Sequence, residues 1–287
     1  MRRYLLVLAA LLPILSAIGW AESAEWTLAH ELYLRTEYRA SLEVLLPFDG
    51  KDAAATQLIG QDYFQLGEYR KASESLERAA SLAPDHPDCL LWLGRAYGRR
   101  AETSGPFTSP GYAAKARQMF ERVVALDPSN REAVGDLFAY YLEAPGFLGG
   151  GQSKAEALAA RVAQKDPAEG HYYQAQIDDR RKQFDSAEQH LRTALALAPR
   201  QVGRFIDLAK FLGARGRAKE SDAFFEEAER LAPDSPRVLY ERAASYIKNG
   251  RNLDEARLLL RRYLRAPLTP SDPPRSQAEA LLKKIGA

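Results

Sequence analysis

A 34-residue period constrains the fold of this chain more than any other feature of its sequence. Pro199, Pro233 and Pro267 are 34 residues apart, and each follows a stretch of helix-forming residues. Three further stretches of the same kind end at Pro84, Pro128 and Pro167. A unit of this length cannot bury its own apolar face and must stack on its neighbours. The period therefore predicts an all-α solenoid that has no single closed core.

The clearest unit spans residues 53–86, and we expect it to form two antiparallel helices. Its recurring positions are Ile59, Gly60, Tyr63, Gly67, Glu68, Tyr69, Ala72, Leu76, Ala79 and Pro84. Small residues at Gly60 and Ala72 allow two helices to approach closely, and larger apolar residues fill the remaining space. A proline after the second helix stops it, because proline cannot donate to the helical ladder. These residues are predicted to serve packing rather than chemistry.

This pattern resembles the tetratricopeptide repeat (TPR), and the resemblance covers nearly the whole chain after the N-terminal segment. Later units carry matching residues at Leu93, Gly94, Tyr97, Ala116, Phe120, Leu137, Tyr141, Ala155, Ala175, Ala187, Leu191, Leu208, Ala209, Phe225, Ala228, Ala243, Tyr246 and Ala256. Asp178 stands where an aromatic residue is expected. The resemblance implies an all-α, right-handed superhelical solenoid of antiparallel helix pairs. About six to seven repeats and a C-terminal capping helix are expected.

The chain divides into four predicted parts. They are a signal peptide or anchor at 1–21, a degenerate first helix pair at 22–52, a solenoid at 53–268, and a linker with a capping helix at 269–287. Ser276 and Glu279 have the spacing of a capping box, which predicts the start of that final helix.

The N-terminal segment has the plan of a secretory signal peptide. Arg2 and Arg3 precede an apolar run, and small residues at Gly19 and Ala21 fit a cleavage site. The run is shorter than the roughly 20 residues that span a bilayer, and Pro13 interrupts it. We expect an exported protein of the bacterial periplasm. An uncleaved anchor in the inner membrane, with the chain facing the periplasm, is the alternative.

Charge and cysteine content exclude several classes of protein. The 40 Lys and Arg residues nearly balance the 38 Asp and Glu residues, so no bias toward nucleic acid or acidic lipid exists. The single cysteine, Cys89, cannot form an intramolecular disulfide. Membrane contact is expected only through an uncleaved N-terminal segment.

The sequence carries no pattern typical of catalysis, a cofactor or a metal. The four histidines form no helical metal pair, and the sequence has no G-x-S-x-G elbow. Residues 85–89 gather Asp, His, Asp and Cys, but they fall at a predicted turn where Asp85 or Asp88 can cap a helix. Residues 146–153 resemble a phosphate-binding loop only partly, because Gln152 replaces its lysine. Capping of the next helix by Ser153 and Glu156 explains this stretch better.

Two units are longer than the period, by ten and five residues. We expect loop insertions near 99–115 and 143–154, side by side on one edge of the solenoid, because equivalent turns of stacked repeats align. The apolar residues in these insertions are Phe107, Tyr112, Phe147 and Leu148. They form either a hydrophobic ledge for a partner or a contact between the two loops.

The concave face is the predicted partner groove. The register of the TPR family carried onto this chain assigns to it Gln57, Gln61, Phe64, Gln65, Arg95, Arg99, Glu143, Tyr172, Gln176, Asp179, Arg180, Lys210, Arg237, Tyr240 and Lys248. Amide, aromatic and basic groups suit an extended or helical protein segment with acidic character. A merely solvated polar face is the alternative.

These observations predict a non-enzymatic protein-interaction scaffold with an unidentified protein or peptide partner, acting in cell-envelope assembly. Two other functions remain open at this point. One is a small-ligand protein or enzyme that uses a pocket beneath the inserted loops, and the other is a self-assembling structural protein.

Overall fold

The computed structural model describes residues 24–286, so the predicted signal peptide or anchor at 1–21 lies outside the described residues. Within 24–286 the chain forms fifteen α-helices and two short 3₁₀ helices, without a β-strand. The first half contains α1 (Ala24–Leu34), α2 (Tyr38–Leu45), η1 (Leu46–Phe48), α3 (Ala53–Gln65), α4 (Tyr69–Leu82), α5 (Pro87–Thr103), α6 (Ser109–Leu126), α7 (Arg131–Glu143), η2 (Gly146–Leu148) and α8 (Gln152–Ala163). The second half contains α9 (Pro167–Arg180), α10 (Phe184–Leu197), α11 (Val202–Ala214), α12 (Ala218–Leu231), α13 (Pro236–Lys248), α14 (Leu253–Arg265) and α15 (Arg275–Lys284).

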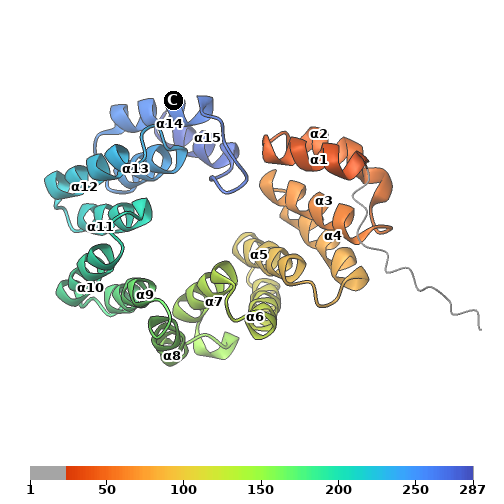
Figure 1. Ribbon diagram of the computed structural model, residues 1–287, viewed down its shortest axis with the longest axis horizontal. Coiled ribbons are helices and arrows are strands. Elements are labelled where there is room, and N and C mark those ends of the chain that lie inside the picture. Colours follow the sequence, from red (N-terminus) through yellow and green to blue (C-terminus); the bar gives the residue numbers. More distant parts are fainter. Residues whose placement is uncertain (1–23, 287) are drawn as a thin grey trace, which may run out of the picture.

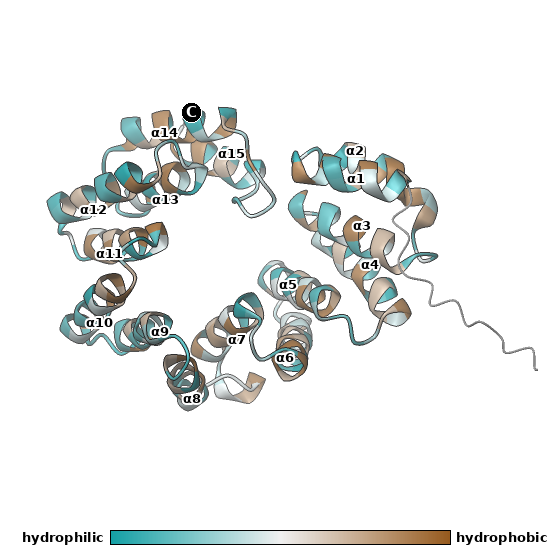
Figure 2. Cartoon of the chain, in the orientation of Figure 1, coloured by the Kyte–Doolittle hydropathy of each residue, from teal (hydrophilic) through white to brown (hydrophobic). Residues whose placement is uncertain are grey.

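The helices pack as seven successive pairs, from α1 with α2 to α13 with α14, and α15 covers the last pair. Figure 1 shows these pairs arranged around a curved path, with α3, α5 and α7 on its inner side. Every helix carries both polar and apolar residues (Figure 2), as expected when one stripe of each helix is buried. The predicted all-α solenoid with a C-terminal capping helix is therefore confirmed.

Two glycines allow the helices of a pair to pack at close range. A Cβ atom at Gly60 would lie 2.5 Å from Cγ of Leu76, which is fully buried on α4. A Cβ atom at Gly94 would lie 2.6 Å from Cε1 of Phe120 on α6. Neither site has room for a side chain. The close approach predicted for Gly60 is present, and the following repeat reproduces it at Gly94.

The longer of the two insertions is mostly helix, which corrects the loop predicted near 99–115. Helix α5 has 17 residues and α6 has 18, compared with 13 and 14 in the preceding pair, α3 and α4. Only residues 104–108 separate α5 from α6. Pro110 was part of the loop signal, but it lies in the first turn of α6, where a missing N–H costs nothing.

The shorter insertion is a loop, residues 144–151, built around η2. Gly149 has a φ of 83°, in the left-handed region that favours glycine. A Cβ atom at Gly150 would lie 2.0 Å from the carbonyl oxygen of Ala144, so this position also requires glycine. Arg117 of α6 lies directly against Gly149, and the loop therefore rests on the helix pair before it.

Three predicted helix caps are wrong. Helix α5 is capped by His86, whose Nδ1 accepts from the backbone N–H of Cys89 at 3.3 Å, and not by Asp85 or Asp88. Helix α8 begins at Gln152 after Gly151, so Ser153 already lies inside the helix. Helix α15 begins at Arg275 after Pro274, which leaves Ser276 no capping role. In the last two cases a residue with special backbone geometry, glycine or proline, determines the helix start instead of a side chain.

The curvature brings the two ends of the solenoid together. In Figure 1 the turn before α15 lies across from α3 and α5. Nε2 of Gln65 on α3 donates a hydrogen bond of 3.1 Å to the carbonyl oxygen of Pro270, over a sequence separation of 205 residues. The described chain thus closes on itself. None of its described helices is both long and apolar enough to cross a membrane.

Candidate functional site

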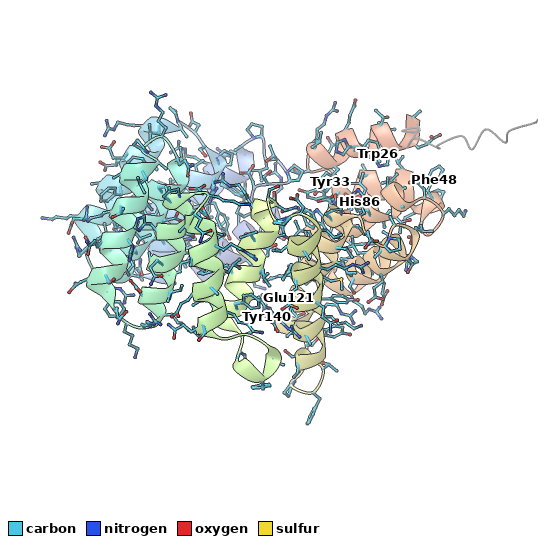
Figure 3. The ribbon with its side chains drawn as sticks, turned by 60° about the horizontal axis from the view of Figure 1, so that its bottom comes forward. Trp26, Tyr33, Phe48, His86, Glu121 and Tyr140 are labelled. Atoms are coloured by element: carbon cyan, nitrogen blue, oxygen red, sulfur yellow. The ribbon has the colours of Figure 1, made fainter. Side chains whose placement is uncertain are left out.

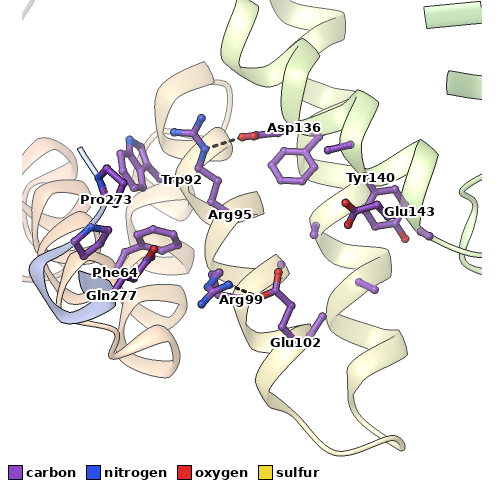
Figure 4. A pocket seen from close by; sticks show the side chains of 18 of the residues that line it. Phe64, Trp92, Arg95, Arg99, Glu102, Asp136, Tyr140, Glu143, Pro273 and Gln277 are labelled. Carbon is purple, nitrogen blue, oxygen red and sulfur yellow. Dashed lines mark hydrogen bonds and ion pairs between the residues drawn. The ribbon is translucent and has the colours of Figure 1, made fainter. Parts of the chain in front are cut away.

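A cavity of about 820 Å³ lies on the inner side of the solenoid, between its N-terminal repeats and its C-terminal segment (Figure 4). Helices α3, α5, α6 and α7, the loop after α7, and residues 270–274 all contribute to its lining. This volume falls in the range of sites that bind small molecules or peptide side chains. Residues from separate stretches of the chain meet here because the repeats curve around it.

Two aromatic side chains form one wall of the cavity. Phe64 of α3 and Trp92 of α5 meet edge to face, with ring centroids 5.3 Å apart and an interplanar angle of 76°. Tyr69 of α4 packs against Phe64 in the same manner at 5.4 Å. Edge-to-face contacts of this kind hold aromatic rings in fixed positions. The wall is therefore a rigid apolar surface that lines the cavity.

Arg95 lies beside this wall but is already paired. Its guanidinium forms ion pairs with Asp136 at 2.6 Å and Glu132 at 2.8 Å, and it also lies 5.2 Å from the ring centre of Trp92. Burial raises the pKa of Asp136, and the neighbouring Arg95 opposes that shift. The two acids of α7 thus neutralise the cation of α5. Its first role is to connect consecutive repeats.

Arg99, one turn further along α5, is also paired, in this case with an acid of its own helix. It forms an ion pair with Glu102, and its guanidinium lies 5.0 Å above the ring of Tyr69. Glu143 also lines the cavity (Figure 4). The expectation of basic groups ready for an acidic ligand therefore needs correction. The cavity is lined by two arginines and by four acids, Glu102, Asp136, Glu143 and Asp272, so acidic groups outnumber basic ones.

Two of the predicted groove amides serve the protein itself. Gln57 and Gln61 both donate to the carboxylate of Asp88 in the next repeat, and Gln61 is buried. Burial raises the pKa of Asp88, and the hydrogen bond from Gln57 opposes that shift. These contacts join α3 to α5. They leave Phe64 and Gln65 as the α3 residues that face the cavity.

The remaining predicted groove residues lie further along the solenoid, outside the lining of this cavity. Tyr172 is covered by the guanidinium of Arg204, 4.6 Å from its ring centre. Lys210 pairs with Glu241 at 2.7 Å. Gln176 is half-buried, whereas Arg180 and Arg237 are exposed. Tyr240 donates to Oε1 of Gln277 at 3.3 Å, so it contacts the capping helix.

Of the four residues predicted to form a hydrophobic ledge, only Phe107 and Phe147 are strongly exposed. Phe107 is 99% exposed and Phe147 is 83% exposed, on two turns that project from the same edge of the molecule (Figure 3). Tyr112 instead stacks on Tyr97 with centroids 6.2 Å apart and is covered by a neighbouring arginine. Leu148 lines the cavity, and its carbonyl oxygen accepts a hydrogen bond from Tyr140.

Sequence reasoning did not assign Trp92, Tyr140 or residues 270–274 to the cavity. Trp92 could have been found, because it lies one helical turn before Arg95 and therefore on the same face of α5. The C-terminal segment gives no such signal. Its position depends on the summed curvature of seven helix pairs.

Within residues 24–286, no group of three or more His, Cys, Asp and Glu side chains is arranged so that it could hold a metal ion. Cys89 is buried, and its thiol contacts the carbonyl oxygen of Leu76 at 3.8 Å. Nδ1 atoms of His171 and His190 lie 2.8 Å apart, and burial lowers the pKa of His171.

Comparisons with known proteins agree with the geometry. The family model described as a TPR repeat matches residues 60–100. A thermophilic TPR protein from Thermus thermophilus, TTC0263, is 20% identical with a TM-score of 0.52, and the match covers 67% of this chain and 99% of that protein. A tetratricopeptide repeat protein from Parabacteroides merdae is 14% identical with a TM-score of 0.57, and the match covers 92% and 98% respectively. No curated protein matches the sequence significantly. The matched repeat at residues 60–100 and the fold shared with solved TPR proteins both support the resemblance to the TPR family.

Proposed function

We propose that this chain is a non-enzymatic scaffold that holds a segment of a partner protein on its inner face, at the cavity beside α3, α5 and α7. The observation that carries this proposal is the aromatic wall of Phe64 and Trp92, facing a cavity of about 820 Å³. Aromatic side chains are enriched at the centres of protein interfaces. Because the repeats hold these rings rigidly, the partner alone bears most of the ordering cost.

Photocrosslinking in cells tests the proposed surface. A photoreactive amino acid replaces Ala139, which lines the cavity on α7 and is exposed. The matched control carries the same amino acid at Glu74, which is exposed on α4 outside the cavity lining. We expect a defined crosslinked partner peptide at position 139 and none at position 74. Equal crosslinking at both positions, or none at position 139, contradicts the proposal.

We also propose that the chain acts outside the cytoplasm, in the bacterial periplasm, in an envelope-assembly process. The support is the arginine pair and apolar run at 1–21. Cell fractionation and N-terminal sequencing test this part separately. A mature chain that begins near residue 22 in the periplasmic fraction is expected, and an intact N-terminus in the inner membrane identifies the anchored form. Recovery of the chain in the cytoplasm contradicts export.

A small-ligand protein, including an enzyme, is the second candidate. Pro145 and Leu148 of the inserted loop line the same cavity, which gives it walls of the kind that small molecules require. Isothermal titration of the purified chain with metabolite mixtures, repeated after deletion of residues 146–151, distinguishes the two functions. Heat release that disappears with the deletion favours a small ligand.

A further inference from the structure

The cavity already has an occupant on one side, which is the chain's own C-terminal segment. Residues 270–274, with the sequence Pro-Ser-Asp-Pro-Pro, all contribute to its lining next to the aromatic wall. Figure 4 shows Pro273 next to Trp92, and Gln277 next to Phe64. The hydrogen bond from Gln65 to the carbonyl oxygen of Pro270 adds a polar contact. Aromatic surfaces together with a backbone contact therefore hold a proline-rich stretch.

Contacts within this segment and with α14 fix its conformation independently of the aromatic wall. The carboxylate of Asp272 accepts hydrogen bonds from the backbone N–H and the hydroxyl of Thr269, at 2.9 and 3.0 Å. Its three prolines have fixed φ angles and therefore lose little freedom on docking. The Tyr263 hydroxyl donates to the carbonyl oxygen of Pro273 and anchors the segment to α14. The last helix pair thus holds the turn in place beside α3 and α5.

From these contacts we propose that the Phe64–Trp92 wall is a recognition site for proline-rich extended segments, and that residues 269–274 occupy it as an intramolecular competitor. The proposal rests on the proposed function and names the chemistry of its partner. Proline-rich segments commonly dock on aromatic-lined grooves, because their preformed backbone reduces the entropy cost of binding. A partner segment of the same kind has to displace the internal one.

The test uses the full chain and a fluorescent peptide with the sequence of residues 267–277 as the probe. Pro270→Gly and Pro273→Gly together weaken the internal segment, and Pro199→Gly with Pro233→Gly is the matched control, because those prolines lie in turns between repeats. An internal competitor acts at an effective concentration on the order of millimolar. We therefore expect the first variant to bind the peptide about tenfold or more tightly than the wild type and the control. Adding Trp92→Ala should abolish binding.

Trp92 also gives a readout that needs no ligand. With Trp20→Phe and Trp26→Phe, it is the sole remaining tryptophan. Release of the internal segment should shift its emission to longer wavelength and increase its quenching by acrylamide in the Pro270→Gly, Pro273→Gly variant. Circular dichroism checks that each variant keeps its helices.

Two results overturn the proposal. Unchanged emission with unchanged peptide affinity shows that the segment does not occupy the wall. Shifted emission without peptide binding shows that the segment only closes the solenoid and that the wall does not recognise proline-rich chains. In either case crosslinking at position 139 decides the proposed function independently, since a partner of other chemistry can still be captured there.

Discussion

Two aspartates in this protein, Asp62 and Asp207, have carboxyl groups whose pKa is raised by burial. Asp62 on α3 is fully buried. Burial raises its pKa to about 8, although the Ser41 hydroxyl acts in the opposite direction. Burial likewise raises the pKa of Asp207 on α11 to about 6, a shift that nearby basic groups oppose. Both carboxyl groups therefore bind a proton more tightly in the folded chain than in the unfolded chain.

The first prediction concerns the pH dependence of stability. Asp62 binds its proton more tightly in the folded chain than in the unfolded chain, where its pKa is near 3.8. The contribution of this group to stability is therefore greatest below pH 4 and is lost as pH rises toward 8. Urea unfolding at pH 5, 6.5 and 8 should show falling stability. Asp62→Asn should weaken that dependence most clearly above pH 7, where Asp207 is largely ionised. An identical pH profile in the variant contradicts the assignment.

The second prediction compares two glycines of the same helix. Gly94→Ala places a Cβ atom 2.6 Å from Phe120, whereas a Cβ atom at Gly98 meets nothing within 4 Å. Overpacking should cost Gly94→Ala about 1–3 kcal/mol. Gly98→Ala should stabilise the chain by about 0.5–1 kcal/mol, because alanine is the better helix former. Thermal unfolding of both variants measures the difference, and equal melting temperatures would refute the packing described here.

At the scale of elements, contacts between successive helix pairs determine how firmly the repeats hold one another. Arg95 of α5 joins Asp136 and Glu132 of α7, which belong to the next pair. Its side chain is only 23% exposed, so this link is partly shielded from water. An ion pair in such surroundings is costly to break from one side, because the acids keep their charge without a partner.

Reversal of this charge gives the third prediction. Arg95→Glu should destabilise the chain by on the order of 2 kcal/mol, since it places three acids together. Arg180→Glu is the control, because Arg180 is exposed on α9 and such changes usually stay within about 0.5 kcal/mol. Chemical denaturation measures both variants.

The fourth prediction concerns the two projecting turns. Phe107→Ser and Phe147→Ser should leave the free energy of unfolding within about 0.5 kcal/mol of wild type, because both rings are exposed and contribute little buried area. Phe120→Ala, at a buried position on α6, should cost about 3–5 kcal/mol. If the double serine variant unfolds much more easily, the turns pack against other residues and are not a free ledge.

At the scale of the whole molecule, local sequence signals predicted the repeat but not the closure of the chain. The period, Gly60 and Ala72 were sufficient for the helix pairs, because each pair is formed by residues close in sequence. Helices α5 and α6 were underestimated, since Gly105, Pro106 and Pro110 resemble a loop while the helices simply extend toward them. Of the residues predicted for the partner groove, Phe64, Gln65, Arg95 and Arg99 line the cavity. The partners of Arg95 and Gln65 were missed, because Asp136, Glu132 and Pro270 come from other parts of the solenoid.

The hydrogen bond between Gln65 and Pro270 changes how the molecule should respond to force. In an open solenoid each repeat touches only its neighbours, so a stretched chain can lose its pairs one at a time from either end. Here a contact spanning 205 residues shields most of the repeats from tension applied at the two termini. That contact has to break before the tension reaches the helices between α3 and α14. The intervening repeats therefore unfold only after the two ends of the solenoid have separated.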